Sequence, residues 1–218
     1  MAKIKYTKNE LKAQRDALTR FRRYLPTLQL KKQQLQMELR TLEAQIAEKR
    51  GEEEKARADL ASWVKLFSEP PAVSSAEPPA VSSNAEPFDF APYIQVEKIE
   101  RSYGNIAGVA IPIFGSISFV EATPDLFETP AWVDGGIELL RQLIRLRVER
   151  QIIEEQHRLL SEELRTTSQR VNLFEKVKIP ECRENIRVIR IFMGDQQTAA
   201  VARSKIAKGK SVEKVRSA

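Results

Sequence analysis

The sequence contains little of the chemistry on which most enzymes and metal proteins depend. It has one cysteine, Cys182, and one histidine, His157, in 218 residues. These counts exclude a disulfide framework, a cysteine-based zinc site and most histidine-based metal or triad chemistry. No run of about 18 apolar residues is present, so no bilayer span is expected. The first residues have no apolar core of a signal peptide, and we therefore expect a cytosolic protein.

Glycine and aromatic residues are also scarce, whereas charged residues make up 30% and hydrophobic residues 42% of the chain. This composition is typical of long helices and argues against a disordered chain. No glycine-rich phosphate loop follows a strand and opens a helix. The adjacent carboxylates of Glu154 and Glu155 face apart on a helix, so they do not share a site. We expect no catalytic, cofactor-binding or metal-binding residues, and no enzyme activity of the chain's own.

The first third of the chain has the apolar spacing of one coiled-coil helix, from near Thr7 to about Phe67. Twelve of its sixteen seam positions are apolar, with alternate spacings of three and four residues. The seam passes through Pro26 without a change of phase, which predicts a kinked but continuous helix. Lys49 and Glu53 occupy two of the other seam positions. The proposed seam residues here are Leu11, Leu18, Phe21, Leu25, Leu28, Leu35, Leu39, Leu42, Ile46 and Leu60.

The last part of the chain carries a second seam of the same kind. Thr129 fits the N-cap and Pro130 the first helical position, and the helix is predicted to end near Ala202. The spacing of three and four holds on both sides of Pro180, but the phase shifts by one residue between the two halves. This shift indicates a skip in the coiled coil, helped by the proline. Arg150 and His157 lie on this seam, with the proposed core residues Leu143, Leu146, Ile153, Leu160, Leu164, Val171, Phe174, Ile179, Cys182, Ile186, Ile189 and Met193.

Between the two helices the sequence changes character. Residues 69–84 are two tandem octets that begin EPPAVSS, a composition typical of an extended or disordered linker. Residues 92–121 are the only β-like stretch, and residues 104–108 supply turn residues between two alternating apolar segments. Pro112 cannot donate to a β-ladder, so its strand is expected at a sheet edge or a bulge. We predict a small β-hairpin that lies on the helices.

These segments predict a mainly α fold. It is a long antiparallel two-helix coiled-coil hairpin with a small β-hairpin-containing insert at the turn end. Neither helix is expected to fold alone, because each needs a partner along its length. The predicted segments are an N-terminal coiled-coil helix (1–68), a duplicated linker (69–87), the insert (88–128), a C-terminal coiled-coil helix (129–205) and a basic tail (206–218).

Positive charge is concentrated at the two ends of the chain. Residues 1–32 carry ten Lys/Arg against two Asp/Glu, and residues 201–218 carry six against one. In the predicted hairpin both ends meet at the tip opposite the insert. Solvated, frayed termini and a nucleic-acid-binding arm are the other interpretations. The proposed basic tip is Lys3, Lys5, Lys8, Lys12, Arg15, Arg203, Lys205, Lys208 and Lys210.

The insert also carries candidates for contact with a partner. They are apolar or aromatic residues in or beside the insert: Trp63, Ile113, Phe114 and Trp132. The two tryptophans flank the insert, where they can also pack on each other.

Several segments, in order, resemble the D subunit of the V-type and A-type rotary ATPases, the bacterial branch in particular. They are KYTKNEL at 5–11 with RYLPTLQLKKQQL at 23–35, NIAGV and IPIF within 105–114, TPAWVD at 129–134, and RVNLFE at 170–175. The resemblance covers most of the chain outside the duplicated linker.

The resemblance implies a rotor subunit whose catalytic residues belong to other subunits. It implies a central shaft that pairs with a small F subunit, enters the hexamer of catalytic A and B subunits, and seats on a funnel-shaped subunit above the membrane ring. Rotation of the shaft would couple ATP hydrolysis or synthesis to proton or sodium translocation. The resemblance also implies a cytoplasmic location, peripheral to the cell membrane.

Two alternatives come from other classes of protein. A prefoldin-like chaperone also joins coiled-coil helices by β-hairpins, but it needs apolar helix tips and these ends are charged. A nucleic-acid-binding hairpin would use the basic ends with interleaved aromatic residues for stacking. Tyr6, Phe21 and Tyr24 are available for that role, although Phe21 falls on the seam.

Overall fold

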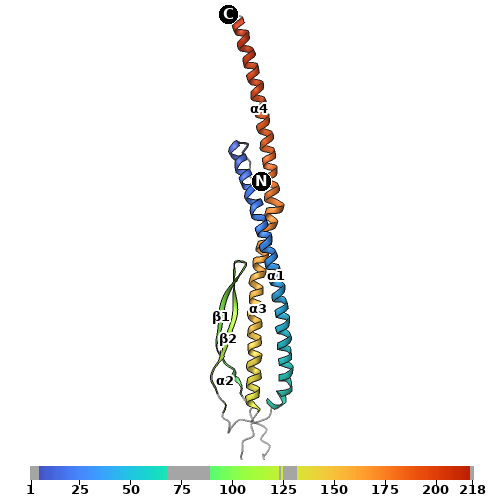
Figure 1. Cartoon of the computed structure of the whole chain (residues 1–218), viewed down its shortest axis with the longest axis vertical. Coiled ribbons are helices and arrows are strands. Elements are labelled where there is room, and N and C mark those ends of the chain that lie inside the picture. Colours follow the sequence, from blue (N-terminus) through green and yellow to red (C-terminus); the bar gives the residue numbers. More distant parts are fainter. Residues whose placement is uncertain (1–4, 68–88, 123, 125–131, 217–218) are drawn as a thin grey trace, which may run out of the picture. The chain divides into compact units, whose positions relative to one another are not determined.

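The protein is mainly α-helical, as predicted, and the described residues include a two-stranded antiparallel sheet (Figure 1). The computed structural model describes residues 5–67, 89–122, 124 and 132–216, without the side chains of 62–67 and 212–216. The duplicated linker and the predicted cap at Thr129 and Pro130 lie outside these residues. In chain order the elements are α1 (Lys8–Phe67), α2 (Ala91–Ile94), β1 (Val96–Ile106), β2 (Val109–Phe119), α3 (Val133–Leu173), the π-helix η1 (Phe174–Lys178) and α4 (Ile179–Arg216).

The chain forms two compact units that share the long helices. Unit 1 contains residues 1–33 and 165–218, and unit 2 contains residues 34–164. Each unit therefore combines a segment of α1 with a later helical segment, and unit 2 also contains the β-hairpin.

Helix α1 spans Lys8–Phe67 and runs through Pro26 without a break, which confirms the predicted continuity. Thr7 caps its start, because its hydroxyl accepts the backbone N–H of Glu10 at 3.2 Å and its carbonyl accepts that of Leu11 at 3.0 Å. A side chain at the N-cap satisfies a donor that the helix itself cannot pair. Pro26 is exposed, so its ring lies on the solvent side of the helix.

In unit 2, α1 and α3 run antiparallel. Glu43 of α1 contacts His157 of α3, whereas Glu53, ten residues later, contacts Arg150, so the numbers rise along one helix as they fall along the other. The buried core lies further along the same pair. Its members come from α1, α3 and β2, and they are Leu35, Leu39, Leu42, Leu160 and Ile111. A hydrophobic cluster with three contributing elements fixes the hairpin on the helices.

The β-hairpin lies lengthwise beside α3, as predicted (Figure 1). β1 and β2 pair from Val96 with Phe119 up to Ile106 with Val109. The turn is Ala107 and Gly108, both with positive φ, which is the geometry of a tight two-residue hairpin turn. It packs against the core through the half-buried Ala107 and Val109.

The turn is shorter than the sequence suggested. Gly104 and Asn105 were predicted as turn residues, but both lie within β1. Asn105 instead supports the turn through its side-chain oxygen, which accepts the backbone N–H of Gly108 at 2.9 Å. An alanine with positive φ is unusual, so Ala107 gave no turn signal.

A bulge at Gly115 breaks the predicted alternation along β2. Glu100 pairs with Ser116 and Arg101 with Phe114, so Gly115 has no partner in the ladder. A Cβ at this glycine would lie 3.0 Å from the carbonyl oxygen of Glu100, and no side chain fits there without a shift of the backbone. The bulge also confirms the expected edge or bulge character of the strand that holds Pro112.

In unit 1, α1 again runs antiparallel to the later helical segment. The rings of Phe21 and Phe174 are 5.0 Å apart, and those of Tyr6 and Phe192 are 4.9 Å apart. Between these levels, the side-chain amide of Asn185 donates to that of Gln14 at 3.4 Å.

The predicted phase shift before Pro180 takes the form of the π-helix η1. The seam spacing is three or four on both sides, but five residues separate Phe174 from Ile179. The N–H of Ile179 donates to the carbonyl of Phe174, five residues back. A π-turn accommodates one extra residue in this way. Pro180 has no N–H, so the wider turn comes where the α-helical ladder would already miss a donor.

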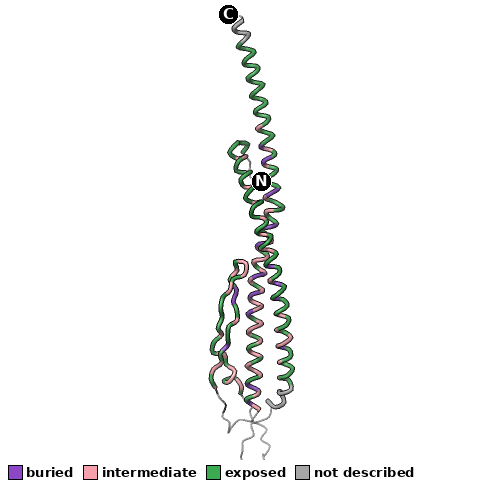
Figure 2. The backbone as a smooth tube through the Cα atoms, in the orientation of Figure 1, coloured by how far each residue is buried: buried purple, intermediate pink, exposed green. Residues whose placement is uncertain are grey.

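Helix α4 continues to Arg216, so the predicted end near Ala202 is wrong. The tail was inferred from its positive charge, but Lys, Arg and Ala are strong helix formers and no proline follows. Residues 194–211 are all exposed (Figure 2).

Candidate functional site

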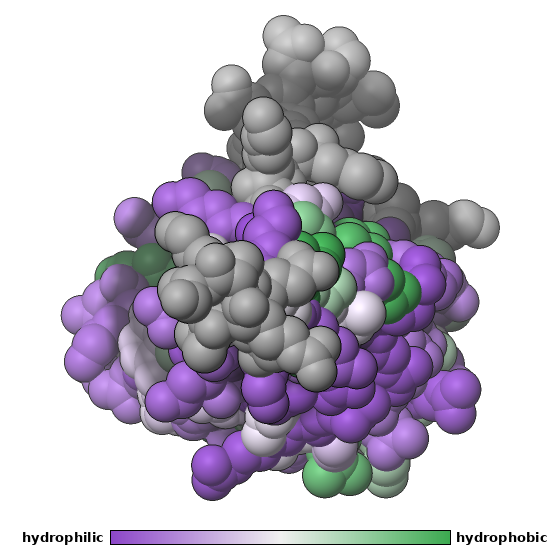
Figure 3. All heavy atoms as spheres, turned by 90° about the horizontal axis from the view of Figure 1, so that it is seen from above, coloured by the Kyte–Doolittle hydropathy of each residue, from purple (hydrophilic) through white to green (hydrophobic). Residues whose placement is uncertain are grey.

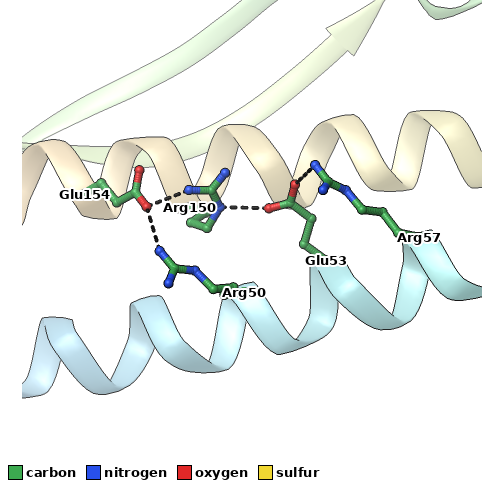
Figure 4. Close-up of polar contacts among 5 residues, drawn as sticks. All are labelled: Arg50, Glu53, Arg57, Arg150 and Glu154. Carbon is green, nitrogen blue, oxygen red and sulfur yellow. Dashed lines mark hydrogen bonds and ion pairs between the residues drawn. The ribbon is translucent and has the colours of Figure 1, made fainter.

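A connected cluster of five charged residues lies between α1 and α3 in unit 2 (Figure 4). We call Arg50, Glu53, Arg57, Arg150 and Glu154 the ion-pair cluster. One carboxylate oxygen of Glu53 accepts from Arg150 Nε at 2.8 Å, and the other accepts from Arg57 at 2.7 Å. Arg150 also donates to Glu154 at 2.6 Å, and Arg50 lies 3.9 Å from the same Glu154 oxygen. Two contacts of the cluster, Glu53–Arg150 and Arg50–Glu154, therefore join α1 to α3.

Burial and charge act together in this cluster. Glu53 is 4% exposed, and the hydrogen bond from Arg150 is the main cause that holds its pKa below the ordinary value. The hydrogen bond from Glu53 likewise raises the pKa of Arg150. Beside the cluster, hydrogen bonds to Glu52 and Glu149 raise the pKa of Lys49. The shifts in pKa of Glu53, Arg150 and Lys49 all favour the charged forms of these three groups.

We expect Glu53→Gln to lower the free energy of unfolding at neutral pH by about 1–3 kcal/mol, because Arg150 loses a charged partner in a buried site. The pKa of Glu53 is lowered in the folded chain, so its contribution is full above its ordinary value of 4.5 and is lost as pH falls through the folded pKa. Urea titrations between about pH 7 and pH 3 should therefore show a weaker acid destabilisation in Glu53→Gln. Glu162→Gln, at an exposed carboxylate, is the control, and equal pH profiles for wild type and Glu53→Gln would contradict the expectation.

Side chains of α3 hold the hairpin at two levels. The buried side-chain amide of Gln156 donates to the backbone carbonyl of Pro112. Nearer the start of α3, Arg141 donates to the carbonyl of Tyr93 at 2.9 Å, and its guanidinium lies 5.3 Å from the ring centre of Phe119. The hairpin is therefore attached by polar contacts as well as by the core.

The outer surface of the hairpin exposes large side chains. Tyr103 is 77% and Ile113 42% exposed, although Ile111 is buried. Phe114 is half-buried. An apolar groove of about 520 Å³ lies between the hairpin and the helices, and Ile113 and Phe114 are among its lining residues.

Of the two tryptophans proposed to contact partners, Trp132 is half-buried, with its ring 6.1 Å from that of Phe90. The side chain of Trp63 lies outside the described residues. The proposed packing of the two tryptophans therefore stays a prediction.

Every residue proposed for the seam is buried or half-buried. In unit 2 the buried ones are Leu35, Leu39, Leu42 and Leu160, and in unit 1 they are Val171, Ile179, Cys182, Ile186 and Ile189. The others are half-buried: Leu11, Leu18, Phe21, Leu25, Leu28, Ile46, Leu60, Leu143, Leu146, Ile153, Leu164, Phe174 and Met193. Ile152 was not predicted, yet it is buried and lines the groove beside the hairpin. The two consecutive isoleucines at 152 and 153 point to different sides of α3, and this pattern could have indicated that the helix is covered on a second face.

The two basic ends are offset along unit 1. Tyr6 packs on Phe192, and Arg203 follows Phe192 by eleven residues, or about 17 Å of helix. The expectation that both ends meet is therefore wrong for the described residues, because α4 runs past the start of α1. Lys3 lies outside the described residues. The other proposed tip residues are exposed: Lys5, Lys8, Lys12, Arg15, Arg203, Lys205, Lys208 and Lys210.

Two of the three aromatic residues near the basic end of α1 already have protein contacts, whereas Tyr24 is 56% exposed. Tyr6 packs on Phe192, and Phe21 packs on Phe174. Stacking on nucleic-acid bases needs free aromatic faces. These contacts disfavour the nucleic-acid interpretation.

Hydrophilic side chains dominate the face of the molecule in Figure 3, with apolar side chains in small groups. In the described part of the chain, no group of three or more His, Cys, Asp or Glu side chains could hold a metal ion. None of the helices within the same ranges has the length and apolar character of a membrane span.

The fold is that of a coiled-coil hairpin protein, and comparison with known sequences identifies its family. The family of the ATP synthase D subunit matches residues 10–209. A V-type ATP synthase D subunit of Borreliella burgdorferi is 49% identical over 216 residues, which cover 99% of this chain and 98% of that protein. Proteins of the same name from Chlamydia caviae and Chlamydia felis are each 34% identical over 209 residues, 96% of this chain and 94% of theirs. The chain belongs to the ATP synthase D subunit family.

Proposed function

We propose that this chain is the central-stalk rotor shaft of a V-type ATPase or ATP synthase, a non-catalytic subunit that transmits torque. The family match over nearly the whole chain carries the proposal. In this role the shaft links ATP hydrolysis or synthesis in the catalytic hexamer to proton or sodium translocation by the membrane ring. The complex holds the chain at the cytoplasmic side of the cell membrane.

The internal structure of each unit suits the transmission of torque. A single helix twists easily, whereas two helices that are cross-connected at several levels resist relative rotation and sliding. In unit 2 these connections include the ion-pair cluster, and in unit 1 they include the tilted ring pair of Phe21 and Phe174. Helix α1 contributes to both units without a break.

We further propose which partners the surfaces contact. The basic residues of unit 1 lie inside the catalytic hexamer and meet carboxylates there, since exposed Lys and Arg side chains favour an acidic surrounding. The part of the hairpin that carries Ile113 and Phe114, which border the groove beside the helices, contacts the F subunit or tunes hydrolysis. The turn end between α1 and α3 seats on the funnel-shaped subunit.

Cross-linking from single cysteines in the assembled complex tests these contacts. A photoreactive maleimide at Lys5→Cys is expected to capture A or B subunits, and one at Ile113→Cys is expected to capture the F subunit. The wild-type chain is the control, because Cys182 is buried and burial raises the pKa of its thiol. Capture of membrane-ring subunits from Lys5→Cys would refute the placement of the basic end. A chain that fails to co-purify with the complex would refute the rotor role itself.

A further inference from the structure

The apolar seam of unit 2 is interrupted where the ion-pair cluster lies. Lys49 and Glu53 of α1 and Arg150 of α3 occupy seam positions that elsewhere hold apolar residues. An apolar seam repeats every seven residues, so a shift by one heptad again matches apolar residues with apolar residues. Hydrophobic contacts alone therefore specify the register of two long helices weakly.

The ion-pair cluster distinguishes one register from the others. Its contacts run in an unbroken order from Arg57 to Glu53 on α1, across to Arg150 and Glu154 on α3, and back to Arg50 on α1 (Figure 4). A slide of α3 by one turn would break both crossings at once. It would also remove Arg150 from the buried carboxylate of Glu53, which would keep only its contact with Arg57 on α1.

A second crossing pair flanks the cluster. Lys49 Nζ lies 3.1 Å from Glu149 and 2.9 Å from Glu52. Both members of the crossing pair are less than a third exposed, so this contact is partly shielded from solvent. It supports the same register as the cluster.

A gain in the free energy of unfolding does not explain why charged residues occupy these seam positions. The desolvation of two buried charges offsets much of their attraction, and a well-packed apolar pair of similar volume is often as stable or more stable. Buried polar groups are best attested as devices that select one register. The position of the cluster on the seam fits that use.

We propose that the ion-pair cluster is a register lock, which prevents α1 and α3 from sliding past each other when torque acts on the two helices. Its mechanical consequence rests on the proposed rotor function, but the lock itself is a property of the chain alone. Without the lock, apolar contacts hold the helices together in more than one register, and torque at one end is partly lost as slippage.

Distance measurements between spin labels on the two helices test the lock in the full chain. The labels are placed at the exposed positions Ala44→Cys and Gln142→Cys, and the chain without these two cysteines gives the background from Cys182. The test variant combines Glu53→Met with Arg150→Met. Both it and its control carry Glu149→Gln, which removes the flanking crossing pair.

The control replaces the exposed pair Arg158 and Glu162 by methionines. That pair is 3.0 Å apart within α3 and does not cross between the helices. We expect a single narrow distance distribution in the control. In the test variant we expect a broadened distribution or a second population, shifted by up to about 10 Å, the rise of one heptad.

A single narrow distribution in the test variant would overturn the lock. Loss of its helical circular dichroism signal would also overturn it, because the cluster would then serve folding rather than register. Each variant is then assembled into the complex, where ion transport per ATP hydrolysed is expected to fall in the test variant alone. If the register slips but this ratio is unchanged, the lock stands and the torque-transmitting role of unit 2 is contradicted.

Discussion

Deletion of Val177 is expected to leave unit 1 folded, with a thermal midpoint equal to or above that of the intact chain. Val177 lies in η1 and its side chain is exposed, so its loss removes little packing. The deletion brings Phe174 and Ile179 to the spacing of four that an α-helical seam requires. The π-turn then has no extra residue to accommodate, and the rest of the seam keeps its place.

Deletion of Arg187 is the matched opposite. Arg187 is exposed as well, but it lies in the α-helical part of the seam. Its removal shifts every later residue back by one position, so Arg190 and Gly194 take the places of Ile189 and Met193. A charge then faces the core where the fully buried Ile189 packs.

We expect this second deletion to cost about 3 kcal/mol or more, the range for loss of a large buried side chain. Thermal and urea unfolding followed by circular dichroism measure both deletions. Equal stability of the two deletion variants would show that the seam phase is not what η1 preserves.

Leu160→Ala is expected to destabilise unit 2 by about 2–5 kcal/mol, the range for leucines removed from a core. Leu160 has no exposed surface, and it shares its cluster with Leu39 of α1 and Ile111 of β2. The cavity would therefore open at the junction of three elements. Urea unfolding gives the free energy, and hydrogen exchange should show lost protection of the hairpin amides as well as of α3.

Met37→Ala is the control for Leu160→Ala. Met37 is 69% exposed on α1, and exposed substitutions of this kind usually change stability by less than about 0.5 kcal/mol. A similar cost for both variants would mean that the three-element cluster does not hold unit 2 together.

Periodicity made the helices and the hairpin predictable. The seam through Pro26 predicted one continuous α1, and the one-residue phase shift before Pro180 predicted an irregularity that is now seen as η1. Both predictions depend on repeated apolar spacing, which many residues report together.

Features that depend on single residues or on the pairing of distant ones were harder to predict. Ala107 adopts positive φ in the turn, a conformation that an alanine in the sequence does not predict. Arg150 and Glu53 were visible as charges on two seams, but only the register of the helices decides that they meet. The extension of α4 was missed because its charge was interpreted as a tail, although its residues favour a helix.

The exposed residues 194–211 of α4 have a thermodynamic consequence. A helix without a packed neighbour is only marginally stable in water, even when its sequence favours helix. In the free chain its backbone therefore unwinds and reforms far more often than the paired segments do. A partner that encloses these residues must suppress that unwinding, and this entropic penalty makes their docking weaker and more readily reversible than the contact area alone would suggest.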